Sequence, residues 1–67
     1  MSGDRYWQTA QQVCTPLELQ TLELRDRRHM GSRLIALHLG VSRAAIRERL
    51  DNADRKIKHA LEKETAA

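Results

Sequence analysis

Two arginines that follow a short turn are the residues in this chain best suited to do chemistry. Arg43 and Arg47 come just after the Leu-Gly-Val segment at 39–41 and lie four positions apart, so on a helix they share one face with Ala44. The planar guanidinium group forms paired hydrogen bonds with phosphates and with the edge of guanine. A narrow face with a small alanine beside two arginines, and Glu48 next to them, fits the major groove of double-stranded DNA.

The charge of the chain supports a polyanionic partner. The chain has 12 basic and 9 acidic residues, and nine of the basic residues are arginines. Residues 25–58 hold ten basic and four acidic residues, a net charge of +6, so the two ends together carry −3. A basic centre is typical of a nucleic-acid-binding surface. We expect Arg27, Arg28 and Arg33 to contact phosphates, and the alternative is that they compensate helix dipoles.

The size of the chain excludes several classes of protein. With 67 residues, two aromatic residues and no phenylalanine, it can form one small domain. No apolar run approaches the roughly 20 residues of a membrane span, and no secretion signal is recognisable. The single cysteine, Cys14, fits a reducing compartment, and its spacing from the three histidines is not that of a metal site. We therefore expect a cytoplasmic, nucleoid-associated protein that is not an enzyme and has no cofactor.

Helices must position these side chains, because no stretch alternates polar and apolar residues over the length of a strand. The sequence predicts an all-α fold, a small helix-turn-helix bundle of three core helices. An N-terminal segment over residues 1–14 precedes them, with a short helix from Asp4 to Val13. Asp4 is the expected cap of that helix, and Trp7 is expected to cover the open end of the core.

The second helix has the clearest start signal. Thr15-Pro16-Leu17-Glu18 is a capping box with proline at the first helical position, and the helix is predicted to run from Pro16 to Arg28. Leu17 and Leu24 are expected to widen its apolar face. Cys14 is expected to be a small buried apolar group rather than a reactive thiol.

The third and fourth helices form the predicted helix-turn-helix. The third runs from Ser32 to Leu39, with Gly31 or Ser32 as its cap, and ends at Gly40, which suits a left-handed backbone. Ser42 is the expected cap of the fourth helix, which begins at Arg43 and continues to about Lys63, so that the domain spans 15–63 and residues 64–67 fray. The apolar seam of the fourth helix comprises Ile46, Leu50, Ala53, Ile57 and Ala60 or Leu61.

The far end of that seam leaves two arrangements open. Ile57 and Leu61 extend past the region that the other core helices can cover. They either pair two chains into a homodimer or are covered by the segment around Trp7.

Three stretches carry a resemblance to a known family. They are TPLELQTLELR at 15–25, IALHLGVS at 35–42, and RAAIRERL followed by ADRKI within 43–57. With this pattern, residues 15–57 resemble the promoter-binding region 4 of sigma-70-type factors, which is similar to the LuxR-type domain. IALHLGVS followed by an isoleucine is typical of helix-turn-helix proteins in general, and the TPLE box upstream narrows the resemblance to these two families.

The resemblance implies a three-helix domain whose last helix recognises a −35-type element or an operator. It implies base contacts by the exposed positions at the start of that helix and phosphate contacts by Ser42 and by the start of the preceding helix. The corresponding base-contacting positions are Arg43, Ala44, Arg47 and Glu48, and the backbone-contacting positions of the preceding helix are Ser32 and Arg33.

The chain departs from the family at Leu34, where a glutamate is common, so an apolar side chain is expected to be exposed there. No other sigma region is recognisable, which predicts a free-standing module. The leading hypothesis is a sequence-specific transcriptional regulator that binds double-stranded DNA, with a phage or mobile element as one origin. The alternatives are an adaptor or sigma-like decoy that binds RNA polymerase or another factor, and the DNA-recognition subunit of a packaging machine.

Overall fold

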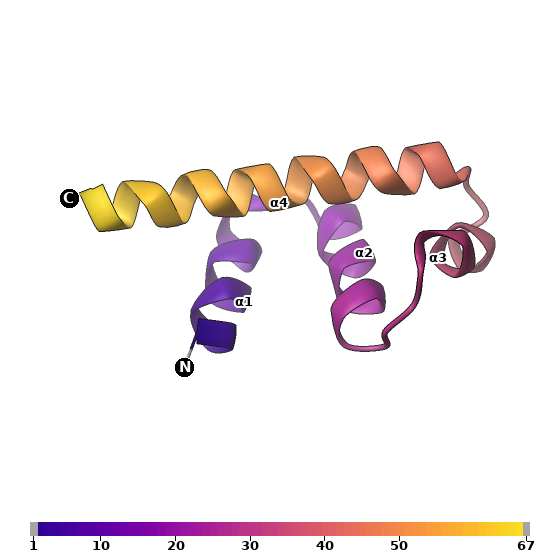
Figure 1. The fold of residues 1–67 in the computed structure, drawn as a ribbon, viewed down its shortest axis with the longest axis horizontal. Helices are drawn as coiled ribbons and strands as arrows, with labels where there is room; N and C mark the ends of the chain where they lie inside the picture. The colour runs from indigo at the N-terminus through magenta and orange to yellow at the C-terminus, as the bar shows by residue number, and fades with distance from the viewer. Residues whose placement is uncertain (1, 67) are drawn as a thin grey trace.

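The computed structural model describes residues 2–66, which form four helices and no strand (Figure 1). The helices are α1 (Ser2–Val13), α2 (Pro16–Asp26), α3 (Ser32–Leu39) and α4 (Arg43–Ala66). The long helix α4 runs along the length of the molecule, and α1, α2 and α3 follow one another along one side of it. The predicted all-α helix bundle is therefore confirmed. None of these helices is both long enough and apolar enough to cross a bilayer.

The core lies where the three shorter helices meet α4. The predicted seam of α4 is buried from Ile46 to Ile57, and α1 contributes Ala10 to the same core. The buried apolar residues are Ala10, Leu22, Leu24, Ile35, Ala36, Ile46, Leu50, Ala53 and Ile57. Burial of each of the larger of these side chains stabilises the fold by about 1.5–3 kcal/mol.

The start of α2 has the predicted capping box. The backbone N–H of Glu18 donates to Thr15 Oγ1 at 3.2 Å, and the N–H of Thr15 donates to Glu18 Oε1 at 2.9 Å. Lys56 Nζ of α4 donates to the same carboxylate oxygen at 2.9 Å, which fastens the start of α2 to α4. Burial raises the pKa of Glu18, but the hydrogen bonds from Lys56 and Thr15 outweigh it, so that the pKa is lowered overall.

The predicted end of α2 at Arg28 is wrong, because the helix ends at Asp26. Arg27 and Arg28 both donate their N–H groups to the carbonyl of Glu23, so the last turn widens. His29 then takes a left-handed backbone with φ of 55°, and the following residue returns its N–H to Leu24 at 3.1 Å. The helix thus ends two residues earlier than predicted, and a histidine takes the left-handed position that glycine usually occupies after a helix.

The predicted bounds of α3 and the start of α4 are confirmed. Gly31 is the N-cap of α3 and provides no side-chain hydrogen bond. Gly40 ends the helix with φ of 71°, a left-handed conformation that glycine adopts without the penalty of a Cβ atom. Ser42 Oγ accepts the N–H of Ala45 at 3.1 Å and so caps α4, as predicted.

Both ends of the chain differ from the expectation. The first helix begins at Ser2, so Asp4 lies in its first turn and is not its cap. The last helix continues to Ala66 instead of ending near Lys63 with a frayed tail, and the Glu64 carboxylate forms an ion pair of 2.6 Å with Arg5 of α1. The expectation for Ala67 lies outside the described residues.

The end of the α4 seam is covered by the segment around Trp7, which is one of the two arrangements that the sequence left open. Ile57 is buried, and Trp7 and Leu61 are packed against the core from α1 and α4. The alternative of a homodimer through this seam required Ile57 and Leu61 to be uncovered, and Ile57 is buried and Leu61 is half-buried. The prediction that Leu17 and Leu24 widen the buried face of α2 holds for Leu24, which is buried, and is wrong for Leu17, which is 58% exposed.

Candidate functional site

A basic hollow lies between the start of α3 and the start of α4. It has a volume of about 370 Å³ and is lined by Gly31, Ser32, Arg33, Arg43 and Arg47. These residues are far apart in the chain, and the helix-turn-helix brings them together. Four of the predicted site residues, the serine and the three arginines, therefore line one surface feature.

Local sequence explains this arrangement. Ile35 of α3 and Ile46 of α4 are both fully buried in the core, which holds the two helices against each other on their inner sides. Gly40 reverses the chain between them, and the Ser42 cap fixes where α4 begins. With their inner sides fixed, the helices direct polar residues at their starts toward solvent.

The arginines of the basic hollow are accessible. Arg33, Arg43 and Arg47 are exposed, and within residues 2–66 none of them forms an ion pair or a hydrogen bond through its guanidinium group. Helix α1 packs against α4 at the other end of the molecule, where Arg5 meets Glu64 (Figure 1). The amino-terminal helix therefore does not cover the basic hollow.

The other residues predicted at the start of α4, Ser42, Ala44 and Glu48, do not line the hollow. Ala44 and Glu48 are exposed. The hydroxyl oxygen of Ser42 accepts a hydrogen bond as the helix cap, and its O–H proton remains available to donate to an anion. The start of α4 also presents unpaired backbone N–H groups and the positive end of the helix dipole, which favour negative charge at this place.

The chain around the basic hollow has no acidic residue over a long stretch. Between Asp26 and Glu48 there are five arginines and no aspartate or glutamate. The ion pairs of the described residues lie elsewhere, on α1, α2 and the middle and end of α4. Positive charge is thus concentrated at the α3 end of the molecule, where it produces an attractive field for a polyanion.

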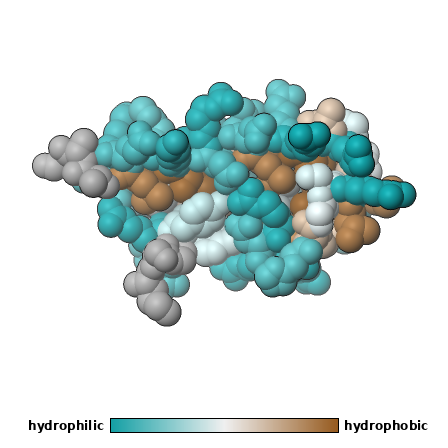
Figure 2. Space-filling view, viewed as in Figure 1, coloured by the Kyte–Doolittle hydropathy of each residue, from teal (hydrophilic) through white to brown (hydrophobic). Residues whose placement is uncertain are grey.

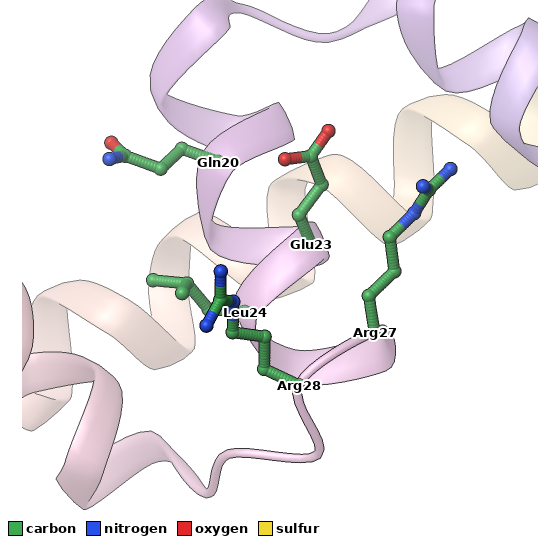
Figure 3. Close-up of a pocket in the computed structure, with 5 residues that line it drawn as sticks. All are labelled: Gln20, Glu23, Leu24, Arg27 and Arg28. Carbon is green, nitrogen blue, oxygen red and sulfur yellow. The ribbon is translucent and has the colours of Figure 1, made fainter.

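Arg27 and Arg28, predicted as phosphate contacts, lie in a different hollow. It has a volume of about 720 Å³ and is also lined by Gln20, Glu23 and Leu24 of α2 (Figure 3). The two arginines diverge, with Arg28 turned back toward Leu24 and Arg27 extending the other way. The guanidinium carbon of Arg27 lies 4.7 Å from the ring centroid of Trp7, an attractive cation-π contact.

A polar network that sequence reasoning missed joins α1, α2 and α4. Arg25 Nη1 donates to Asp54 Oδ2 at 2.9 Å, and Arg25 Nε donates to Asp26 Oδ1 at 2.7 Å. The Tyr6 hydroxyl donates to Asp54 Oδ1 at 3.2 Å and accepts from Arg25 Nη2. The hydrogen bonds to both carboxylates raise the pKa of Arg25. The only signal in the sequence was that Arg25 and Asp54 have opposite charges, and many other pairs share it.

The two remaining groups with altered pKa values have structural roles. Burial, followed by the charge of Asp54, raises the pKa of Tyr6 to about 12. Burial, followed by the charge of Glu18, raises the pKa of the Cys14 thiol, which donates to the carbonyl of Ala53 at 3.9 Å. A thiol with a raised pKa is a poor nucleophile. Cys14 packs against the core as predicted, but it is half-buried and not fully buried.

The described residues hold no group of three or more histidine, cysteine, aspartate or glutamate side chains that can bind a metal ion. The chemistry of the site is therefore that of exposed guanidinium groups, hydroxyls and backbone N–H groups. In comparisons with known proteins, no family model, no curated protein and no solved structure matches the chain.

Proposed function

We propose that the chain is a sequence-specific regulator of transcription that inserts the start of α4 into the major groove of double-stranded DNA. The observation that carries this proposal is the meeting of Ser32, Arg33, Arg43 and Arg47 in one exposed basic hollow. The similarity of residues 15–57 to sigma-70 region 4 and LuxR-type domains supports it. The lack of acidic residues between Asp26 and Glu48 also supports it, because DNA presents one phosphate charge about every 1.7 Å of its axis.

Different residues contact the bases and the phosphates. Arg43 and Arg47 donate paired hydrogen bonds to guanine edges, and each such contact discriminates against a wrong base by about 1–3 kcal/mol. Ala44 allows the helix to approach the bases closely. Glu48 accepts from the amino group of cytosine, as carboxylates do in major grooves. Sequence preference thus arises from one turn and a half of α4.

Phosphate contacts fix the register of the helix on the duplex. Arg33 and Ser32 contact the backbone from the start of α3, and the Ser42 hydroxyl contacts it from the start of α4. Arg28 extends the basic surface, whereas Arg27 is engaged by Trp7 and contributes less. A single module offers few base contacts, so tight binding needs two copies on neighbouring half-sites.

Selection of duplexes from a random pool tests the proposal directly. The full chain is expected to enrich a short motif. The double variant Arg43→Ala/Arg47→Ala is expected to lose preference for that motif over random duplex while retaining the helical circular dichroism of the parent. A matched control is Arg55→Ala/Lys58→Ala, which removes two exposed charges from the same helix away from the basic hollow. Failure to enrich any motif, or unchanged preference in the first variant, contradicts the proposal.

A further inference from the structure

The outer face of α3 exposes an apolar stripe. Its members, Leu34, Leu37 and Val41, are 55%, 73% and 36% exposed. Leu34 and Leu37 are three residues apart and lie on one side of α3, and Val41 follows in the turn after Gly40. Figure 2 shows the corresponding hydrophobic surface over the α3 end of the molecule. We call these three residues the α3 stripe.

The α3 stripe is not part of the fold's own packing. The opposite side of α3 carries Ile35 and Ala36, which are buried in the core, so the helix already has a complete inner face. Exposed large apolar residues on one side of a short helix are a candidate surface for contact with another molecule. The fourth exposed large hydrophobic residue, Leu17, lies on α2 and stands apart from this helix.

The charge next to the α3 stripe indicates which kind of molecule binds it. Arg33 carries a positive charge at one edge of the same outer face, and α3 contains no acidic residue. The nearest acidic residues along the chain are Asp26 and Glu48. A second copy of this face would bring no carboxylate to pair with Arg33. A DNA backbone gains nothing from leucine side chains, because they cannot donate hydrogen bonds to phosphates.

We propose that the α3 stripe docks an amphipathic helix of a partner protein that has acidic residues along the edges of its apolar face. The partner's apolar residues, repeating at three and four positions, pack between Leu34, Leu37 and Val41 as ridges of one helix fit grooves of another. Its carboxylates lie toward Arg33 and the neighbouring basic surface. The proposal goes beyond DNA binding, since no residue of the α3 stripe lines the basic hollow and only Arg33 at its edge belongs to both surfaces.

Two designed helical peptides provide the test. Both have 18 residues with leucines on one face. One has glutamates along the edges of that face, and the other has lysines at the same positions. Each is titrated into the full chain without DNA, and the methyl signals of Leu34, Leu37 and Val41 are followed by NMR while affinity is measured by fluorescence anisotropy. We expect the glutamate peptide to shift these three methyl signals and to bind more than about tenfold more tightly than the lysine peptide.

Variants test whether peptide binding depends on the α3 stripe or on exposed apolar residues in general. Leu34→Gln/Leu37→Gln is expected to weaken binding of the glutamate peptide more than about tenfold, whereas Leu17→Gln, an equally exposed leucine outside the stripe, leaves it unchanged. Both changes are at exposed positions, and circular dichroism checks that the fold is kept. Equal binding of the two peptides, or shifts elsewhere than in the stripe, overturns the proposal. So does a concentration-dependent dimer, seen by sedimentation, that only the double variant abolishes, because a second copy is then the occupant.

Discussion

Arg25 of α2 and Asp54 of α4 meet through two hydrogen bonds, with Nη1 lying 2.9 Å from Oδ2 and Nη2 lying 3.2 Å from Oδ1. The Tyr6 hydroxyl of α1 joins the same carboxylate. This contact is the place where three helices of the bundle are connected by polar groups. It lies outside the basic hollow, so it can be altered without removing any residue proposed to contact DNA.

Asp54→Asn is expected to destabilise the fold by about 1 kcal/mol. The change weakens the charge-assisted hydrogen bonds between Arg25 and residue 54. Because this pair is partly exposed and screened by solvent, the loss in the free energy of unfolding stays close to that of surface ion pairs. Urea unfolding followed by circular dichroism measures it. The control is Asp51→Asn on the same helix, where the carboxylate is exposed and has no ion pair among the described residues. Equal effects of the two variants contradict the role assigned to Arg25 and Asp54.

The titration of Tyr6 couples stability to alkaline pH. Its pKa is raised from 10.0 to about 12 in the folded protein, chiefly by burial. The unfolded chain therefore loses the proton first, and the stabilising contribution is complete below pH 10 and is lost as the pH rises toward 12. The free energy of unfolding is expected to fall over this window. Tyr6→Phe is expected to remove that component of the fall, and parallel pH curves for parent and variant contradict the assignment.

His29→Gly is expected to stabilise the protein by about 1 kcal/mol. His29 ends the widened turn after α2 with φ of 55°, a conformation that costs about 1–2 kcal/mol for a residue with a Cβ atom and little for glycine. Part of this gain is offset by the greater entropy of glycine in the unfolded chain. His38→Gly, within α3, is the matched control and is expected to destabilise by about 0.5 kcal/mol, because histidine is itself a weaker helix former than alanine. Thermal unfolding of both variants decides whether the left-handed turn stores this energy.

Arg33→Ala is expected to weaken DNA binding about equally for all sequences. As a phosphate contact, Arg33 contributes to the release of counterions, so the slope of log affinity against log salt is expected to fall by about 1. Arg55→Ala is the control and leaves the slope unchanged. A shallow salt dependence of the parent chain favours the adaptor hypothesis, in which the chain acts by contact with RNA polymerase or another protein.

Features specified by neighbouring residues were predictable from the sequence. Several features form from a few adjacent residues and need no contact with distant parts of the chain. They are the Thr15 capping box, the bounds of α3, the left-handed Gly40 and the Ser42 cap. The burial of the α4 seam was predictable as well, because its spacing leaves one apolar face. The gathering of Ser32, Arg33, Arg43 and Arg47 followed from these local features together with the resemblance to region 4.

Features that depend on contacts between distant segments were not predictable. The end of α2 was misplaced because its stop signal is His29, a residue that rarely adopts a left-handed backbone. The contact of Arg27 with Trp7 was not predictable, because Trp7 lies twenty residues earlier and nothing near Arg27 in the sequence indicates it. The choice between covering Ile57 with α1 and pairing it with a second chain required knowledge of where α1 packs.

Because α4 is one continuous helix, the packing of its buried residues determines the direction in which its arginines point. The helix has 24 residues, so it is about 36 Å long, and the segment that carries Arg43 and Arg47 is continuous with the segment that Ile57 anchors in the core. Each residue turns an α-helix by about 100°. Inserting one residue after Leu50 would therefore rotate Arg43, Ile46 and Arg47 together by about 100° relative to Ile57. The register of the buried seam thus sets the direction in which the two arginines face.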